Sequence, residues 1–419
     1  MKLTVIGGGS PYTPELIDGF SRLRELLPIE ELWLVDPDAH RLDLVSGMAR
    51  RMFVRAGHPG TIMATSDVVA GVENADVVLL QLRIGGQAAR QGDETWPHEA
   101  QVIGQETTGP GGFAKALRTV PVVLDIAENV RRHAKPNAWI IDFTNPVGIV
   151  TRALLQAGHR AVGLCNVAMG FQRRFASMLD VDFAEVQLDH VGLNHLTWER
   201  GVTVRGRNVL PRLLGERVEE LAEVVELSPS LLTLLGSVPS YYLRYFYDHD
   251  EVLKEQLASP TRAEAVMDVE RELLDLYADP HVDTKPAILE KRGGAYYSEA
   301  AVDLIASLVS DRRDVQVVNL VNNGAMPFLP DDHVIEVPAT VGSDGVSALP
   351  IERLPDDLAG LIGDVAGYER LALDAAVHGG RDRVLRALVA HPLVRQFEKA
   401  ERLTDLLLAT NAQHLAWAK

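Results

Sequence analysis

The first sixteen residues, MKLTVIGGGSPYTPEL (Met1–Leu16), decide the fold. The apolar run at the start predicts a β-strand over Lys2–Ile6, and three glycines follow that strand directly. We expect a helix immediately afterwards, with Thr13 as its N-cap and Pro14 in the first helical position, where a missing N–H costs nothing. A strand, a glycine turn and a helix in this order bring a pyrophosphate against free backbone N–H groups. The residues predicted to hold a dinucleotide here are Gly7, Gly8, Gly9 and Ser10.

Two further positions bear on the cofactor. Tyr12 occupies the place of the third glycine of the usual fingerprint, and a glycine triplet alone indicates little, because tight turns use glycine freely. Asp36 ends the second predicted strand, where an acid is expected to bind the ribose hydroxyls of the cofactor. A carboxylate there repels a 2′-phosphate, so it favours NAD over NADP. The alternative is a plain turn residue at a strand end, within the sequence VDPD.

Outward from this turn, short apolar runs alternate with helical stretches, which predicts βαβ units and a parallel sheet. Six strands of this kind indicate an α/β, Rossmann-type doubly wound sheet, which we assign to an NAD-binding domain over residues 1–190. The predicted strands are Lys2–Ile6, Glu31–Val35, Thr61–Thr65, Asp76–Leu82, Ala138–Phe143 and Ala161–Cys165.

The rest of the chain, residues 191–419, is predicted to form an α+β lobe for substrate binding and oligomerisation. A second lobe is expected because 419 residues exceed the size at which one hydrophobic core keeps growing. Apolar residues at helical spacing predict helices over Ala263–Tyr277 and Arg383–Ala390. Between them we expect strands at Val315–Asn319 and His333–Pro338, followed by a loop at Val341–Val346.

Composition narrows the class of protein. A net charge of −17 argues against nucleic-acid binding, which needs clustered Lys and Arg. No apolar run is long enough to span a membrane, and the N-terminus does not resemble a signal peptide. The single cysteine, Cys165, excludes an intramolecular disulfide and fits a reducing compartment. We therefore expect a soluble cytoplasmic protein whose partner is a small molecule.

Five segments point beyond an ordinary dehydrogenase. They are RIGGQAAR (83–90), GQETTGPGG (104–112), DFTNP (142–146), GLCN (163–166) and GLNHL (192–196). Together they resemble the family 4 glycoside hydrolases, whose fold is close to that of lactate and malate dehydrogenases. The resemblance runs nearly end to end and includes YYLRYFY (241–247), KRGGAYYS (291–298) and VNNGAMPFLPDD (321–332).

The resemblance implies a metal site. The family's cysteine and histidine ligands fall on Cys165 and His195, and two protein ligands leave coordination positions for sugar hydroxyls and water. Mn²⁺ is the family's usual ion, although a thiolate and an imidazole by themselves suit softer metals better. The alternative for Cys165 is a small buried hydrophobe. The nearby His190 matches no family ligand and is interpreted as structural.

The resemblance also implies a catalytic base and a substrate site. The family's base is a tyrosine that falls on Tyr242, and Glu106 matches a position that raises its basicity. Lowering a tyrosine pKa from 10 to 7 takes about 4 kcal/mol of electrostatics, which a divalent cation and an arginine supply. Without the family match, Tyr242 is one aromatic of a pocket wall. The expected substrate-binding residues are Arg90, Asn145, Asn166 and Arg292, the last with a helix-start ion pair as its alternative.

The implied reaction is a redox-assisted elimination, unlike the two-carboxylate scheme of most glycosidases. NAD⁺ oxidises C3, a base removes the C2 proton, the aglycone leaves, and the hydride returns after water adds. Asn166 stands where the α-specific members have an acidic aspartate, which favours 6-phospho-β-glucosides as substrates. The alternatives are an unphosphorylated or differently configured glycoside, a simple NAD-dependent dehydrogenase, and a silent NAD- and sugar-binding regulator. A homodimer or homotetramer is the family expectation.

Overall fold

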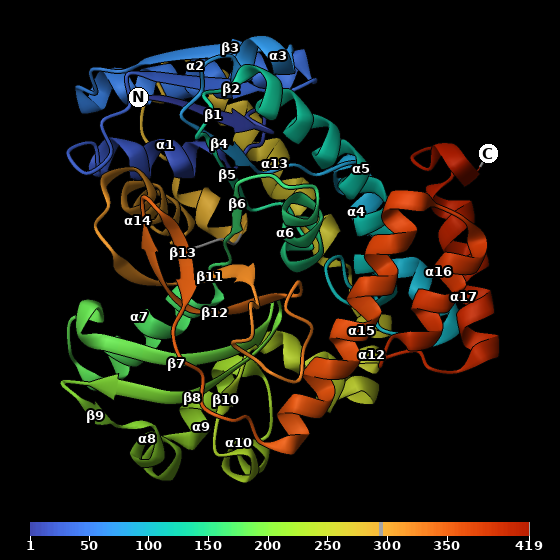
Figure 1. The fold of residues 1–419 in the computed structure, drawn as a ribbon. Helices are drawn as coiled ribbons and strands as arrows, with labels where there is room; N and C mark the ends of the chain where they lie inside the picture. The colour runs from blue at the N-terminus through green and yellow to red at the C-terminus, as the bar shows by residue number, and fades with distance from the viewer. Residues whose placement is uncertain (293–295, 419) are drawn as a thin grey trace.

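The largest element of the computed structural model, which describes residues 1–292 and 296–418, is one mixed β-sheet (Figure 1). Nine strands in those residues follow the order β13-β12-β11-β6-β5-β4-β1-β2-β3. The six strands from the first part of the chain all pair in parallel, as predicted for a Rossmann-type sheet. Their bounds are β1 Lys2–Ile6, β2 Glu31–Val35, β3 Thr61–Thr65, β4 Val77–Leu80, β5 Trp139–Asp142 and β6 Ala161–Gly163.

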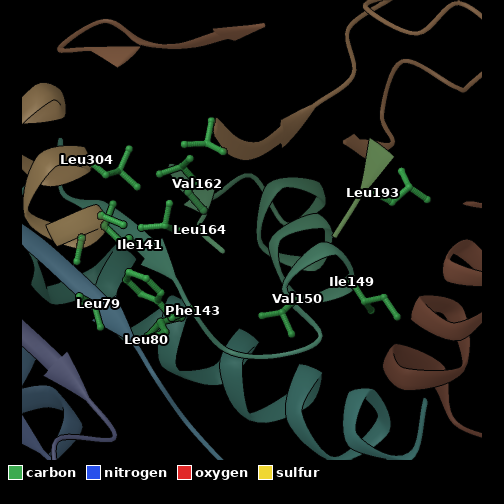
Figure 2. Packing of buried hydrophobic residues seen from close by; sticks show 14 of the residues in the cluster. Leu79, Leu80, Ile141, Phe143, Ile149, Val150, Val162, Leu164, Leu193 and Leu304 are labelled. Carbon is green, nitrogen blue, oxygen red and sulfur yellow. The ribbon is translucent and has the colours of Figure 1, made fainter. Parts of the chain in front are cut away.

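The central strands are buried on both faces, which explains their continuous apolar sequences. Every residue of β4, Val77–Leu80, and of β5, Trp139–Asp142, is buried. In the register of the sheet Leu79 lies opposite Ile141, and Ile141 lies opposite Val162. Figure 2 shows this core together with Leu304, which comes from a helix of the second half of the chain. The core of the first domain is therefore completed by residues distant in the sequence.

Three later strands extend the same sheet. They are β11 Asp314–Val321, β12 Val334–Gly342 and β13 Gly345–Ala348, and β11 pairs antiparallel with β6. The strand predicted at Val315–Asn319 lies within β11, and the one predicted at His333–Pro338 begins one residue before β12. The predicted loop at Val341–Val346 is wrong. Val341 pairs with Val346 and Gly342 with Gly345, so the Gly-, Ser- and Asp-rich segment is a tight β-hairpin.

A second, antiparallel sheet follows the first six strands. It consists of β7 Val186–Leu193, β8 Leu196–Val204, β9 Arg207–Asn208 and β10 Val238–Pro239. A two-residue turn, Asn194–His195, joins β7 to β8, and His195 has a left-handed φ of 63°. The boundary predicted between residues 190 and 191 falls inside β7, and the two-domain division stays a prediction.

Helices cover both faces of the large sheet, and those at the C-terminal end of the chain form a group beside α4 and α5 (Figure 1). The predicted helices lie within α13 and α16. None of the helices described is both long and apolar enough to cross a membrane. The first half contains α1 Thr13–Arg22, α2 Ala39–Ala56, α3 Val68–Val72, α4 Gly86–Thr95, α5 Gly109–His133, α6 Val147–Gln156 and α7 Val167–Leu179. The second half contains α8 Leu210–Glu216, α9 Val218–Val225, α10 Pro229–Leu235, α11 Arg244–Tyr247, α12 His249–Ala258, α13 Arg262–Ala278, α14 Tyr297–Ser310, α15 Asp356–His378, α16 Arg381–Ala390 and α17 Phe397–Asn411.

Residues 293–295, in the middle of the KRGGAYYS segment, lie outside the described residues. The residues on either side of that gap are described. Arg292 ends a short 3₁₀ helix, Ala287–Arg292, and Tyr297 begins α14. Helix α14 packs against β12 and against α1, the helix that follows the glycine turn.

Candidate active site

A cleft of about 590 Å³ lies at the carboxyl ends of β1, β4, β5 and β6, where ligands bind in open α/β sheets. Most of the residues that the sequence predicts for the site meet there. Those lining the cleft are Gly7, Gly9, Ser10, Asp36, Arg90, Glu106, Asn145, Asn166, Tyr242 and Arg292. Gly8, Cys165 and His195 do not line it directly.

The glycine turn packs tightly against the strands beside it. The amides of Gly7 and Gly8 both donate to the carbonyl of Val35, at 2.8 and 2.9 Å. A Cβ atom on Gly8 would lie 2.8 Å from the Cα of Leu34, so no other residue fits there without moving β2. The turn therefore keeps its backbone close to the sheet and free of side chains, which suits the approach of a dinucleotide pyrophosphate.

The predicted N-cap role of Thr13 is wrong. Helix α1 begins at Thr13, with Tyr12 in the capping position, and no side chain caps the helix. The Thr13 hydroxyl instead donates to the carbonyl of Gly8 at 2.9 Å and accepts from the Gln81 amide at 2.9 Å. The turn itself thus supplies the acceptor, and the hydroxyl links the glycine turn to Gln81 at the end of β4.

Asp36 stands at the end of β2 and lines the cleft next to the turn. Its Oδ2 accepts from the amide of Gly9 at 3.0 Å, and its Oδ1 accepts from the amide of Asp38 at 3.0 Å. Burial raises the pKa of this carboxyl above its usual value, although both amides favour the charged form. Asp36 thus shapes the turn and also presents a carboxylate to the cleft, as ribose binding requires.

Glu106 is the centre of a buried charge cluster. Its carboxylate pairs with Arg83, with Arg90 at 3.3 Å and with Lys115 at 2.6 Å. Burial disfavours the Glu106 carboxylate, but the three cations outweigh it and hold the pKa of Glu106 well below its usual range. Burial and the neighbouring Arg83 lower the pKa of Lys115 to about 8. Lys115 lines the cleft and was missed from the sequence, because it lies in an ordinary helical stretch of α5.

The predicted base, Tyr242, lies in a 3₁₀ turn, Tyr241–Leu243, and its ring stacks on His195. The ring centroids are 3.7 Å apart and the planes differ by 8°. Burial and the nearby Cys165 and Glu106 raise the pKa of the Tyr242 phenol, whereas Arg90 lowers it. A cation bound beside the phenol would act in the same direction as Arg90.

Cys165 and His195 supply the donor set expected for the metal. The backbone amides of Val167 and Asn166 and the side chain of Asn194 lower the pKa of the Cys165 thiol. Burial nevertheless raises its pKa, so its thiolate form needs a cation. Burial lowers the pKa of His195 to about 4, which keeps the imidazole neutral near pH 7 and able to bind a metal.

His195 is oriented as expected of a metal-binding histidine. Nδ1 of His195 lies 2.9 Å from the Thr107 hydroxyl, a partner that orients the ring and leaves Nε2 for another contact. No group of three or more His, Cys, Asp or Glu side chains suited to a metal occurs in residues 1–292 and 296–418. A site built on Cys165 and His195 therefore relies on further ligands from substrate or water, and the residues fit such a cation.

Arg292 and two asparagines form the remaining wall of the cleft. Arg292 donates to Glu270 of α13 at 3.1 Å, and its guanidinium carbon lies 5.2 Å from the ring centre of Tyr12. The ion pair does not remove Arg292 from the cleft. The buried Oδ1 of Asn145 has no hydrogen-bond partner among the described residues, so it is an acceptor available to a ligand. Asn166 also faces the cleft, at the start of α7.

Glu270 is a second residue that the sequence did not indicate. It accepts from Gln87 at 2.8 Å, from Arg41 at 3.3 Å and from Arg292. Arg41 and Gln87 lie 229 and 183 residues away in the chain. Because helix α13 reads as a regular amphipathic helix, only the tertiary contact shows that one of its carboxylates organises the arginines of the cleft.

Comparison with known proteins places this geometry in a family. The model of the "Family 4 glycosyl hydrolase" matches residues 2–181, and that of the "Family 4 glycosyl hydrolase C-terminal domain" matches residues 190–394. A probable 6-phospho-β-glucosidase of Bacillus subtilis (strain 168) is 40% identical, over 99% of this chain and 97% of its own.

Solved structures agree with the sequence relatives. The 6-phospho-β-glucosidase of Thermotoga maritima, solved with manganese, NAD⁺ and glucose-6-phosphate, superposes with a TM-score of 0.91 at 33% identity, covering 99% of both chains. Malate dehydrogenase from Salinibacter ruber, 18% identical, shares the fold with a TM-score of 0.55, over 91% of this chain and 99% of its own. The expected dehydrogenase-like fold is thus confirmed, and the chain belongs to family 4 of the glycosyl hydrolases.

Proposed function

We propose that this enzyme hydrolyses 6-phospho-β-glucosides, derived from cellobiose or from aryl glucosides, with NAD⁺ and Mn²⁺ as cofactors. The observation that carries the proposal is the stack of Tyr242 on His195, beside the cleft that begins at the glycine turn. The proposed base lines the same cleft as the glycine turn and stacks on a proposed metal ligand, as redox-assisted elimination needs. The Bacillus and Thermotoga relatives support the choice of a β-linked sugar phosphate.

The cofactors would be held by the residues that the sequence indicated. Gly7, Gly8, Gly9, Ser10 and Asp36 would bind NAD⁺. Cys165 and His195 would bind the divalent cation. When bound, NAD⁺ would take up and return a hydride, and the cation would polarise sugar oxygens.

Tyr242 is the proposed base at C2 of the sugar. Arg90 favours its phenolate, and Glu106 strengthens its basicity through a negative charge that three cations keep ionised. A positioned base of this kind contributes about 10²–10⁴-fold to a rate. Asn166 has an amide where an acid would protonate the leaving oxygen, so the departing group must take its proton from water or from another donor.

Substrate binding is assigned to Arg90, Asn145, Asn166 and Arg292. Asn145 offers a buried acceptor without a protein partner among the described residues, which suits a sugar hydroxyl. The two arginines offer planar cationic donors to oxygens of the sugar or its phosphate. We further propose an NAD-binding domain over residues 1–190, a substrate and oligomerisation domain over residues 191–419, and a cytoplasmic homodimer or homotetramer.

A panel of p-nitrophenyl glycosides tests this proposal. α- and β-linked sugars, each with and without a 6-phosphate, are incubated with NAD⁺, Mn²⁺ and a reductant. The proposal expects release of nitrophenol from the phosphorylated β-glucoside, loss of activity when nucleotide is stripped, and recovery with catalytic NAD⁺. Preference for an unphosphorylated or α-linked sugar would change the substrate, and steady accumulation of NADH would indicate a dehydrogenase. No turnover of any compound would favour a binding protein.

A further inference from the structure

A buried polar network lies behind the candidate metal ligands and takes no part in the mechanism above. Its centre is Glu336 of β12, which is 1% exposed. One carboxylate oxygen lies 3.1 Å from Nε2 of His190. The other accepts from the side-chain amides of Asn194 and Asn319, each at 2.9 Å. Both carboxylate oxygens of Glu336 are therefore hydrogen-bonded. On its far side, His190 contacts Glu199 at 2.6 Å.

The sheet places Glu336 between the two chain segments that carry the ligands. In the strand register Glu336 lies opposite Asn319, and Asn319 lies opposite Gly163, two residues before Cys165. This side of the network is tightly closed, because a Cβ on Gly163 would lie 2.8 Å from the Cβ of Asn319. Glu336 is therefore anchored to the strand that leads into Cys165.

The other side of Glu336 reaches the turn that carries His195. Asn194 immediately precedes His195, and its amide donates to Glu336 at 2.9 Å, a hydrogen bond that bridges β12 to the turn. The same side chain lowers the pKa of the Cys165 thiol. The turn needs such support, because His195 adopts the left-handed region at φ 63°. A non-glycine residue in that region costs about 1–3 kcal/mol and persists only where its surroundings fix it.

We propose that Glu336 is a positioning residue of the metal site. It fixes Asn194 beside His195 and Asn319 beside the strand that leads to Cys165, and so holds the two segments together before a cation binds. The inference rests on the proposed function, since it takes Cys165 and His195 as metal ligands. Partners behind the ligands of a metal site change its affinity by about 10–100-fold when they are replaced.

Metal binding without turnover tests this role. Mn²⁺ is titrated into the full-length protein, free Mn²⁺ is followed by electron paramagnetic resonance, and NAD⁺ affinity is measured separately by calorimetry. Glu336→Gln keeps the shape of the side chain but turns an amide NH₂ toward one of its donors. We expect its Kd for Mn²⁺ to rise about 10–100-fold, with NAD⁺ affinity unchanged. A purely structural role would lower thermal stability and leave the Mn²⁺ Kd alone.

The network provides a matched control. Glu199 is equally buried and bonds the opposite side of His190, but it makes no contact with Asn194. Glu199→Gln should therefore change the Mn²⁺ Kd by less than about threefold. Asn194→Ala removes the bridge itself, and adding Glu336→Gln to it should weaken Mn²⁺ binding little further, since both act through one contact.

The outcomes separate this inference from the proposed function. If the folded Glu336→Gln protein binds Mn²⁺ with wild-type affinity, the positioning role is wrong and the proposed metal site is unaffected. If that variant does not fold, Asn194→Ala provides the same test. If the wild-type protein binds Mn²⁺ no more tightly than the Cys165→Ser variant, the proposed metal site is wrong, and both proposals are wrong with it. A raised Kd in Glu336→Gln and Asn194→Ala, with Glu199→Gln near wild type, supports the role.

Discussion

The ring of Tyr242 lies flat on the imidazole of His195, with centroids 3.7 Å apart and planes within 8°. The stack joins the proposed base to a proposed metal ligand, although the two residues belong to different segments of the chain. Stacking depends on the ring and not on its hydroxyl, so the two contributions of Tyr242 can be separated by substitution.

Tyr242→Phe should lose the base and keep the stack. We expect its hydrolysis rate to fall by about 10²–10⁴-fold, while its melting temperature and Mn²⁺ affinity stay near wild type. Tyr242→Ala also loses the stack and should bind Mn²⁺ more weakly, because His195 is less well held. Steady-state rates and thermal unfolding measure both effects. A Phe variant with an undiminished rate would count against the role of this phenol.

Hydrolysis in D₂O should place deuterium at C2 of the released sugar phosphate. Oxidation at C3 makes the C2 proton acidic, and its removal and return exchange it with solvent, whereas direct displacement at C1 leaves C2 untouched. Proton NMR or mass spectrometry of the product reads the label. Product free of C2 deuterium would contradict elimination and return attention to pairs of carboxylates in the cleft.

Cys165→Ser should weaken activation by Mn²⁺ strongly and leave NAD⁺ binding nearly intact, because the thiolate is the proposed metal ligand and the glycine turn is separate from it. Chelation of the wild-type protein should abolish turnover, and thiol oxidants should have the same effect as the substitution. Activity as a function of Mn²⁺ concentration is the measurement. A variant with the wild-type rate and metal response would show that Cys165 is simply a buried thiol.

Glu106→Gln should be costly to the fold as well as to activity. The change leaves Arg83, Arg90 and Lys115 around a neutral amide, and breaking a buried ion pair typically costs about 3–5 kcal/mol. Urea denaturation measures the free energy of unfolding. The control is Glu99→Gln, at a site 58% exposed with only a distant arginine, where surface charge contributes about 0–1 kcal/mol. Equal free energies of unfolding for the two variants would show that the charge cluster around Glu106 does not stabilise the fold.

His190 should make stability depend on pH in the alkaline range. Burial opposes its charge, but Glu199 and Glu336 outweigh burial and raise the pKa of His190 from 6.5 to about 10. A raised folded-state pKa gives stabilisation that is complete below pH 6.5 and is lost as the pH rises through about 10. The difference in unfolding free energy between wild type and His190→Gln should therefore shrink across this window. A difference independent of pH would show that His190 is not charged in the fold.

The sequence by itself determined the parallel part of the large sheet and the residue types at the site. Strands Lys2–Ile6, Glu31–Val35 and Thr61–Thr65 were predicted to the residue, because the signals are local: runs of strand length, followed directly by glycine, aspartate or serine. The glycine turn and Asp36 were assigned to the cofactor from the local pattern, whereas the base and the metal ligands came from the family resemblance. The fold gathers most of these residues at one cleft.

The tertiary structure alone decided what surrounds those residues. Glu270 joins Arg41 across 229 positions, and Glu336 joins Asn194 across 142. Short-range patterns carry no information about such pairs, because an amphipathic helix or a buried strand looks the same whichever partner its polar residue meets. The misplaced N-cap at Thr13 has the same cause. Its hydroxyl accepts from the Gln81 amide, 68 positions away in the chain, and donates to the glycine turn, so a tertiary contact takes the place of the expected local cap.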